Sequence, residues 1–293
     1  ADIDGPRMFY SCTANVHRYN AVINILHQGG LCPVRADSRE WSLLWANHPP
    51  PQVMRALRPT QRINRFPGSR NLGRKDLLWQ HVARLQRCLG REHHIIPQCF
   101  VLPEACLAWD QARQRSPRAL WIWKPCNGSS GSGIKVLSSD ISQEEAEELG
   151  KRGIVQRYIS NPLLIAGYKF DLRVYVVVLS YDPLKVYIND EGLVRLATER
   201  YSSSVDTLET RRMHLTNYSV NAASHKFVHS RDSKERGLAD ENGGSSEEVG
   251  AFKWSLGELR EHFVGRGLDY DAVLEGIKDV VVKTLVSVEA PMQ

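Results

Sequence analysis

A single strand near the middle of the sequence limits the possible folds most strongly. It begins with the charged stretch KFDLR (169–173) and continues as the apolar, β-branched run VYVVVL (174–179). Successive side chains of a strand point to opposite faces, so we expect Lys169, Asp171 and Arg173 on one face. Unpartnered charges are costly to bury, so this face needs a polar ligand or solvent. The pattern favours a binding site on a sheet, with an exposed sheet face as the alternative.

The composition places the chain among ordinary globular proteins. Its 293 residues are 42% hydrophobic and 24% charged, enough for one large domain or two smaller ones. The net charge of +5 suits an acidic partner, but no basic stripe with interleaved aromatic residues indicates nucleic acid. No apolar run approaches the roughly 20 residues of a membrane span, and no signal peptide is visible. The six cysteines form no Cys-x-x-Cys pair, which predicts reduced, cytosolic thiols.

The first 65 residues predict a small α/β unit. An apolar run at 8–12 is typical of a strand, and the apolar spacing at 20–28 predicts a helix that stops at Gly29-Gly30. A second apolar run follows at 41–45, before the prolines at 49–51 break regular structure.

A basic, turn-rich loop at 64–76 leads into an amphipathic helix carrying Leu77, Leu78, Val82 and Leu85. Lys75 falls in the first turn of this helix, where a cation opposes the helix dipole unless an anion is close. The position indicates an anion-binding lysine or, alternatively, a solvated one.

A glycine-rich loop lies between two predicted strands. The first strand, 118–124, ends on Lys124, and the second spans 134–137, with the sequence CNGSSGSG between them. A P-loop needs Gly-Lys-Ser/Thr leading into a helix, and a dinucleotide fingerprint needs a glycine that opens a helix, so neither motif is present. The pattern fits a hairpin flap whose backbone N–H groups, with Lys124, lie over a triphosphate. The alternative is a flexible hairpin tip.

The chain after the flap predicts a helix with a capping box formed by Ser142 and Glu145, and then a strand at 154–158. Residues 156–159 are expected to link two sheets, where an adenine ring could meet backbone groups. Pro183 and the sequence Asp190-Glu191-Gly192 are expected to mark successive hairpin turns.

The last quarter of the sequence predicts a mobile insertion followed by two helices. Residues 221–251 are polar and least structured at GGSSEE, and a helix is expected at 254–263. A longer helix capped at 269–271 follows. Six apolar residues of this helix are expected in the core: Val273, Leu274, Ile277, Val280, Val281 and Leu285.

Several motifs in one order give the chain its resemblance to a known family. They are FPG (66–68), RKD (74–76), KP (124–125), GSGI (131–134), QRYI (156–159), KFDLR (169–173), EGLVR (191–195) and HLTNYS (214–219). In these motifs the chain resembles the tubulin tyrosine ligase-like proteins, a branch of the ATP-grasp ligases, and is most similar to the branch-initiating polyglutamylases. The resemblance implies an α/β fold with a nucleotide site between two mostly antiparallel sheets. The expected parts are 1–65, a flap-bearing domain 66–153 and an incomplete ATP-grasp domain 154–293.

The activity implied by the resemblance is ATP-dependent tubulin polyglutamylation. ATP would phosphorylate a glutamate side chain in an acidic tubulin C-terminal tail, and the amino group of free L-glutamate would displace phosphate from the acyl-phosphate to leave an isopeptide bond. The implied cofactors are ATP and Mg2+, and the implied partners are tubulin or microtubules, with no nucleic acid and no membrane. We expect a monomer in the cytoplasm, on microtubules, with the cilium or basal body as a further site.

The resemblance also implies roles for individual residues. Arg173, Arg195 and Asn217 would act on the γ-phosphate and the amino-acid side, where positioned cations stabilise the charge of phosphoryl transfer. The nucleotide would contact a larger set of residues: Lys75, Lys124, Gly131, Gly133, Gln156, Arg157, Tyr158, Ile159, Lys169, Asp171, His214 and Thr216.

Two departures from the family pattern leave alternatives open. Ser130 stands where the family usually has an arginine before the flap's Gly-x-Gly, which removes a bidentate donor. The family continues into strands with an aspartate and a Glu-x-Asn pair that hold magnesium, whereas this sequence stops at Gln293 and offers no metal residue. The alternatives are an inactive or truncated member that binds tubulin or nucleotide, or a glycine or tyrosine ligase.

A basic set of loop residues is expected to steer acidic tubulin tails: Arg62, Arg65, Arg70 and Arg74. Ordinary surface arginines that favour solubility are the alternative.

Overall fold

The computed structural model describes residues 7–35, 37–149, 153–227 and 251–292. The chain divides into two compact units, one formed by residues 1–71 with 289–293 and the other by residues 72–288. Each unit is described by itself. The core of the predicted insertion at 221–251 lies outside the described residues, which resume at Ala251.

The first unit is built on a small parallel sheet with strand order β2-β1-β3-β4. Its elements are β1 (Phe9–Cys12), α1 (Asn20–Gln28), β2 (Cys32–Pro33), β3 (Leu43–Trp45), α2 (Pro51–Arg55), β4 (Arg62–Ile63) and α12 (Glu289–Met292), with α3 (Arg70–Gly73) leading into the second unit. The core forms where Tyr10 and Cys12 of β1 pack on Leu26 of α1. The strand predicted at 8–12 and the helix predicted at 20–28 are both confirmed.

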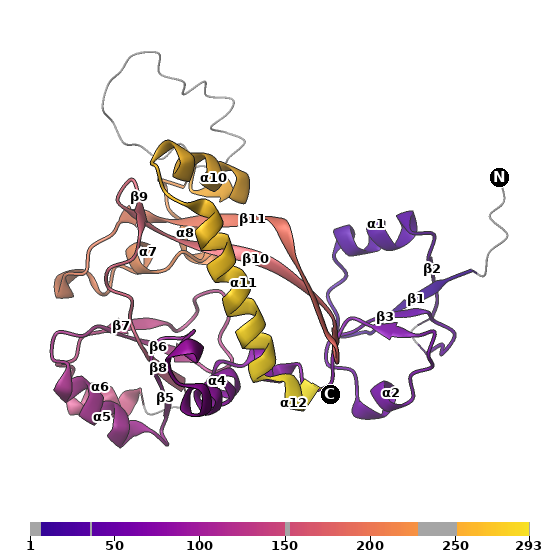
Figure 1. The fold of residues 1–293 in the computed structure, drawn as a ribbon, viewed down its shortest axis with the longest axis horizontal. Coiled ribbons are helices and arrows are strands. Elements are labelled where there is room, and N and C mark those ends of the chain that lie inside the picture. Colours follow the sequence, from indigo (N-terminus) through magenta and orange to yellow (C-terminus); the bar gives the residue numbers. More distant parts are fainter. Residues whose placement is uncertain (1–6, 36, 150–152, 228–250, 293) are drawn as a thin grey trace, which may run out of the picture. The chain divides into compact units, whose positions relative to one another are not determined.

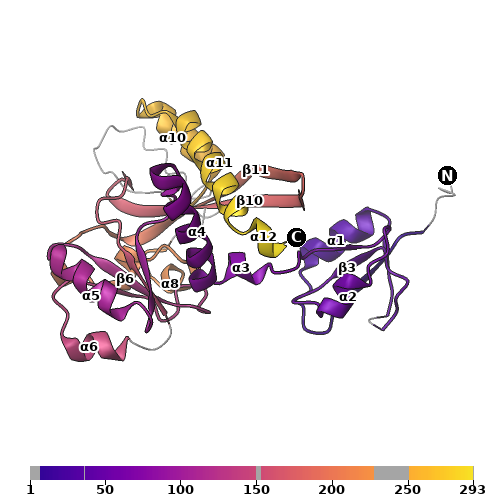
Figure 2. The same ribbon diagram turned by 60° about the horizontal axis from the view of Figure 1, so that its bottom comes forward.

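The second unit contains two four-stranded sheets, visible in Figures 1 and 2. The first sheet has the order β5-β8-β6-β7 and is antiparallel. Its strands and neighbouring helices are α4 (Lys75–Leu89), η1 (Gly90–His93), β5 (Cys99–Leu102), α5 (Cys106–Arg115), β6 (Trp121–Pro125), β7 (Lys135–Leu137), α6 (Gln143–Glu148) and β8 (Gly153–Arg157). The predicted capping box of Ser142 and Glu145 begins α6.

The two faces of this first sheet have different roles. On one face Trp121 and Val155 pack with Trp109 of α5 and Ala146 of α6 in a closed core. On the other face Cys99 and Ile154 pack with Trp79 of α4 near the sheet's edge. Because strand side chains alternate, Ile122, Lys124 and Gln156 lie on this second face. The second face therefore carries Lys124 and Gln156, two of the residues predicted to contact the nucleotide.

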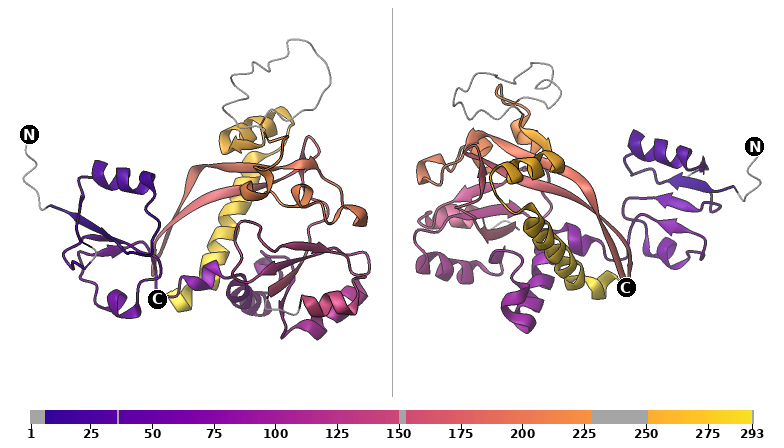
Figure 3. Two further views of the ribbon diagram at one scale, coloured as in Figure 1. Left: turned by 180° about the vertical axis from the view of Figure 1, so that it is seen from behind. Right: turned by 45° about the horizontal axis from the view of Figure 1, so that its top comes forward.

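The second sheet has the order β12-β11-β10-β9 and is dominated by a long hairpin. Its elements are β9 (Leu164–Ile165), β10 (Tyr168–Tyr181), β11 (Leu184–Arg200), η2 (Val205–Thr207), α7 (Arg211–His214), α8 (Tyr218–Asn221), β12 (Lys253–Ser255), α10 (Leu256–Gly265) and α11 (Tyr270–Ser287). Figure 3 shows β10 and β11 continuing as a two-stranded ribbon past their short neighbours. On that ribbon Tyr175, Val177, Leu179 and Tyr187 are exposed.

One predicted hairpin turn is confirmed and the other is wrong. The chain turns between Tyr181 and Leu184, around Pro183. The sequence at 190–192 instead lies inside β11, where a register shift between Val174 and Val176 of β10 absorbs the extra residues. Gly192 is required by close packing, since a Cβ built on it would lie 2.5 Å from the Arg173 carbonyl oxygen.

The apolar residues of α11 are less buried than the sequence predicts. Asp269 caps this helix as expected, accepting a hydrogen bond from the Ala272 amide. Only Leu285 of the six predicted core residues is buried, and Val273 and Val280 are exposed. A helical apolar pattern shows which face is hydrophobic but does not determine whether another element covers it.

Candidate nucleotide and amino-acid site

Charged and hydrophobic residues separate cleanly across the second sheet. Phe170, Leu172, Val194 and Leu196 pack with α10 on one face. Asp171 and Arg173 alternate with Phe170 and Leu172, so they lie on the opposite face, as the sequence predicts for this strand. One core therefore fixes the orientation of the charged side chains.

A row of charges crosses three strands of this sheet. Asp171 of β10 pairs in register with Arg195 of β11, which pairs with Lys253 of β12. Arg195 donates from Nε to Asp171 Oδ1 at 2.7 Å and from Nη2 to Asp171 Oδ2 at 2.5 Å. This two-point ion pair raises the pKa of Arg195 and holds its guanidinium in a fixed plane.

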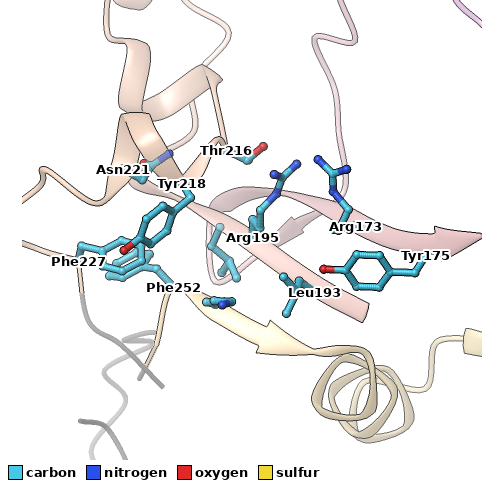
Figure 4. Close-up of a pocket in the computed structure, with 11 residues that line it drawn as sticks. Arg173, Tyr175, Leu193, Arg195, Thr216, Tyr218, Asn221, Phe227 and Phe252 are labelled. Carbon is cyan, nitrogen blue, oxygen red and sulfur yellow. The ribbon is translucent and has the colours of Figure 1, made fainter. Parts of the chain in front are cut away.

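A pocket of about 240 Å3 opens over this row (Figure 4). In Figure 4 the guanidinium groups of Arg173 and Arg195 lie side by side and point the same way. Lys253, Thr216 and Asn221 add polar groups to the wall. The remaining lining is aromatic or aliphatic: Tyr175, Leu193, Leu196, Tyr218, Phe227 and Phe252.

Two cations of the pocket, Arg173 and Lys253, form no ion pair with any carboxylate in the described part of the chain. Asn221 serves a structural role, because its amide accepts from the Thr198 amide and hydroxyl and donates to the Leu215 and Asn217 carbonyls. The pocket therefore offers two available positive groups in a partly apolar lining, which suits a small anionic molecule.

The flap predicted from the glycine-rich loop joins β6 to β7 and is held at its base by Lys75. As the first residue of α4, Lys75 donates from Nζ to the Gly128 carbonyl at 2.6 Å and to the Pro125 carbonyl at 3.2 Å. At the tip, Gly131 and Gly133 have φ of 77° and 69°, which glycine adopts freely. A Cβ on Gly131 would lie 2.8 Å from Asn217 Oδ1, so the flap tip lies directly against this predicted catalytic residue.

Lys124 and Lys169 lie close enough to oppose each other's charge. Lys124 Nζ donates to Gln156 Oε1 at 2.6 Å, and Lys169 Nζ donates to the Tyr158 hydroxyl at 2.8 Å and the His214 carbonyl at 3.1 Å. Burial, together with the charge of Lys124, lowers the pKa of Lys169 to about 8.

Burial likewise lowers the pKa of Lys75 and of Lys124. In the described ranges none of these three lysines has a carboxylate ion-pair partner. A cluster of desolvated cations of this kind favours a bound polyanion.

His214 and Tyr158 form a buried network around Lys169. The Tyr158 hydroxyl and His214 Nδ1 are 3.0 Å apart, and His214 Nε2 lies 3.0 Å from the Thr207 carbonyl. A hydrogen bond to that carbonyl requires the proton on Nε2, which leaves Nδ1 to accept from Tyr158. Burial lowers the pKa of His214, so the neutral ring is favoured.

Not every predicted nucleotide residue turns its side chain toward these cations. Arg157 lies on the opposite face of the first sheet, where its guanidinium stacks 5.5 Å from the Trp121 ring centroid. Ile159 is 59% exposed just beyond β8. Thr216 is buried and lines the pocket over the second sheet. The structure therefore brings together Lys75, Lys124, Gln156, Tyr158, Lys169 and His214, and separately Asp171, Arg173, Arg195 and Thr216.

Sequence reasoning missed Lys253 and Tyr175 as pocket residues. Tyr175 falls in the apolar run of β10 and gives no signal of its own. Lys253 reaches the pocket only because β12 pairs with β11, a strand that is distant from it in the sequence. No local pattern in the sequence marks that pairing.

The described residues fit the phosphate part of a nucleotide better than they fit a metal ion. The lysine cluster offers cationic donors, whereas no group of three His, Cys, Asp or Glu side chains comes together within the ranges that the structure describes. No described helix has the length and apolar character needed to span a membrane.

The fold is a mixed α/β fold of the ATP-grasp type, with its charged groups on sheet faces and a glycine-rich flap. Residues 54–293 match the sequence model of the tubulin-tyrosine ligase family, so the chain belongs to that family. The family had been inferred from the motifs, and that inference is confirmed.

Within this family, the chain is similar to several proteins that are named as tubulin glutamylases. The chain is 40% identical to tubulin monoglutamylase TTLL4 of Mus musculus over 253 residues, which is 85% of the chain and 20% of that protein. It is 37% identical to tubulin polyglutamylase TTLL5 of Homo sapiens over 276 residues, covering 92% of the chain and 20% of that protein. It is 35% identical to tubulin polyglutamylase ttll-4 of Caenorhabditis elegans over 249 residues, covering 85% of the chain and 38% of that protein. The chain thus spans about a fifth of the length of the first two relatives.

Proposed function

We propose that this chain carries the ligase site of a tubulin glutamylase, which joins glutamate to glutamate side chains in tubulin C-terminal tails at the expense of ATP. The relatives named as tubulin glutamylases support the reaction class. The observation that carries the proposal is the pairing of a desolvated lysine cluster with an adjacent cationic pocket. A ligase of this kind needs both a polyanion site and an amino-acid site.

Within this proposal the lysines hold the nucleotide phosphates. Lys75, Lys124 and Lys169 come from three different elements and lack carboxylate partners among the described residues. ATP would supply the phosphoryl group that activates the acceptor carboxylate, and Mg2+ would accompany it. We assign no described residue to the metal.

The pocket over the second sheet is the proposed site for free L-glutamate. Its volume of about 240 Å3 is below the roughly 300 to 1,000 Å3 of pockets for drug-sized ligands, and so suits a free amino acid. Arg173 and Lys253 offer two separate cations, which match the two carboxylates of glutamate. Glycine and tyrosine each have one carboxylate, so this arrangement favours glutamate over them.

In this proposal each pocket residue has a distinct task. Asp171 orients Arg195 through two hydrogen bonds, so the guanidinium is preorganised where negative charge develops during transfer. Asn217 lies against the flap tip, and its sequence neighbours Thr216 and Tyr218 line the pocket. The neutral His214 and Tyr158 keep Lys169 aimed into the lysine cluster.

The first unit offers a surface for the acceptor tail. A groove of about 490 Å3 is lined by Arg55, Arg65 and Arg70 together with Pro49, Pro51, Met54, Phe66 and Pro67. Arg65 donates to the Asn47 side chain and forms no ion pair with a described carboxylate, nor do Arg55 and Arg70. The combination of arginines and apolar surface suits an acidic, extended peptide.

Isotope incorporation tests the proposal. Tubulin would be incubated with the chain, ATP and Mg2+ and with labelled glutamate, glycine or tyrosine in parallel, with a Lys124→Ala variant as the control. Incorporation of glutamate alone, lost in the control, is expected. Incorporation of glycine or tyrosine would identify a different amino-acid ligase.

Calorimetry of ATP with Mg2+ on both proteins accompanies the assay. Binding that the control loses, without any incorporation, would identify a nucleotide-binding member that does not catalyse ligation. Absence of both binding and incorporation would contradict the proposal for this chain.

A further inference from the structure

The tip of the flap is fastened by two side chains that come from a different part of the chain. The Gly131 carbonyl accepts a hydrogen bond from Arg211 Nη2 at 2.7 Å, and the Ser130 carbonyl accepts one from Ser219 Oγ at 2.6 Å. Arg211 opens α7 and Ser219 lies in α8. The segment that contains His214 and Asn217 therefore also binds two successive backbone carbonyls of the flap.

The flap tip has a conformation that depends on such outside contacts. Ser130 has φ of 57°, a left-handed conformation that residues with a Cβ seldom adopt. Within the tip, the backbone bonds are few: the Ser132 amide to the Ser129 carbonyl at 3.0 Å, and the Ile134 amide to the Gly131 carbonyl at 3.5 Å. The hydrogen bond from Ser219 to the Ser130 carbonyl therefore stabilises the residue that has the left-handed conformation.

The base of the flap is held differently, by a residue with a second task. Lys75 binds the Pro125 and Gly128 carbonyls, yet it is also one of the three lysines proposed to bind phosphate. Any engagement of Lys75 by an anion competes with its hold on the flap. The tip contacts of Arg211 and Ser219 do not involve the lysine cluster.

We propose that Arg211 is the positioning residue of the flap, with Ser219 as its helper, and that it keeps the flap tip closed over Asn217 while Lys75 turns to the nucleotide. Arg211 acts through the flap backbone and is not itself a catalytic residue. Arg211 also brings a guanidinium group to the flap tip, where the flap itself carries the uncharged Ser130. The role in nucleotide binding rests on the function proposed above, whereas the role in holding the flap does not.

The neighbouring arginine provides a matched control. Arg212 donates from Nη2 to the Ala223 carbonyl at 3.1 Å and forms no hydrogen bond with the flap among the described residues. Both arginines bind one backbone carbonyl, and they are adjacent in α7. Replacing either removes the same charge from the same helix, but only one replacement releases the flap.

The test uses the full chain and four variants: Arg211→Ala, Arg211→Lys, Ser219→Ala and the control Arg212→Ala. Thermal unfolding first checks that each variant is folded. Hydrogen exchange of the amides of residues 129–133 is then measured without nucleotide, and the Kd for ATP with Mg2+ is measured by calorimetry. In Arg211→Ala we expect exchange to rise by about tenfold, the size of effect that loss of one charge-assisted hydrogen bond gives.

Arg211→Lys should recover part of the protection, since lysine can still donate to the Gly131 carbonyl, and Ser219→Ala should give a smaller increase. Equal exchange in Arg211→Ala and Arg212→Ala would overturn the proposal, whatever the nucleotide data show. If the parent chain binds ATP, Arg211→Ala should raise Kd several-fold while Arg212→Ala leaves it unchanged. A parent chain that fails to bind ATP would contradict the proposed function, and the exchange comparison would still decide the role of Arg211.

Discussion

Asp171 and Arg195 form a two-point ion pair across neighbouring strands, with N to O distances of 2.7 and 2.5 Å. Their side chains are 39% and 20% exposed, so solvent screens the pair only in part. Both residues lie on the sheet face opposite the core packed by α10. The carboxylate therefore fixes a guanidinium at the edge of the pocket without taking part in the core.

The first prediction concerns this pair. Asp171→Ala and Arg195→Ala should each lower the free energy of unfolding, and a double-mutant cycle should give a coupling of about 1 to 2 kcal/mol, as expected for a partly buried bidentate pair. Urea unfolding of the parent, both single variants and the double variant measures it. A coupling near zero would mean that the pair is no stronger than an ordinary surface ion pair.

The second prediction concerns the lowered pKa of Lys169, about 8 in the folded chain against a reference of 10.5. Between these values the unfolded chain binds the proton and the folded chain does not, so stability rises with pH through this group. Compared with Lys169→Met, the parent should gain about 1 kcal/mol in the free energy of unfolding from pH 8 to pH 9.

Urea titrations of both proteins at the two pH values measure this difference. Subtracting the variant cancels the titrating groups that do not interact with Lys169. Parallel pH dependence of the two proteins would show that Lys169 titrates normally.

The third prediction concerns the backbone of the flap. Gly131 and Gly267 have similar left-handed φ values, 77° and 66°, but only at Gly131 would a Cβ meet another group, Asn217 Oδ1 at 2.8 Å. Gly267→Ala should cost about 1 to 2 kcal/mol of stability through backbone strain alone. Gly131→Ala adds a steric conflict at the flap tip.

Hydrogen exchange separates the two effects. Gly131→Ala should increase exchange at residues 129–133, whereas Gly267→Ala should leave those amides unchanged. If the flap amides of Gly131→Ala were as protected from exchange as those of the parent, the close approach to Asn217 would not constrain the flap backbone.

The sequence predicts the parts of this site that depend on local pattern. The alternation of Lys169, Asp171 and Arg173 with Phe170 and Leu172 places the charges correctly, because a strand with one buried face admits only that register. The strands on either side of the flap also follow from local pattern.

What the sequence does not predict depends on contacts between distant segments. Lys253 enters the pocket through its pairing with Arg195, and Arg211 reaches the flap 80 positions earlier in the chain. The turn expected at Asp190 to Gly192 is absent because pairing with β10 continues past it, at a glycine pressed against Arg173. The order of the motifs is enough to identify the family, but the fold determines which side chains become partners.

The fourth prediction tests the burial found along α11. Leu285 is 5% exposed, whereas the adjacent Val286 is 40% exposed. Leu285→Ala should destabilise the second unit by about 2 to 4 kcal/mol, because it removes buried methyl groups and leaves a cavity. Val286→Ala should change stability by less than about 1 kcal/mol. Equal effects in urea unfolding would contradict the orientation of this helix.

The fifth prediction concerns the arginine-lined groove of the first unit and rests on the proposed acceptor. Reversing both Arg65 and Arg70 to glutamate should weaken microtubule co-sedimentation by about tenfold or more at low salt, because two attractive contacts with an acidic tail become repulsive.

The salt dependence of binding should also become shallower, since fewer charges are engaged. Arg35→Glu is a control in the same unit, because Arg35 is highly exposed, pairs with Asp37 and does not line the groove. If the double reversal and the control bind microtubules alike at every salt concentration, the groove is not the tail site. Loss of binding in the double variant together with retained ATP binding would separate acceptor recognition from the nucleotide site.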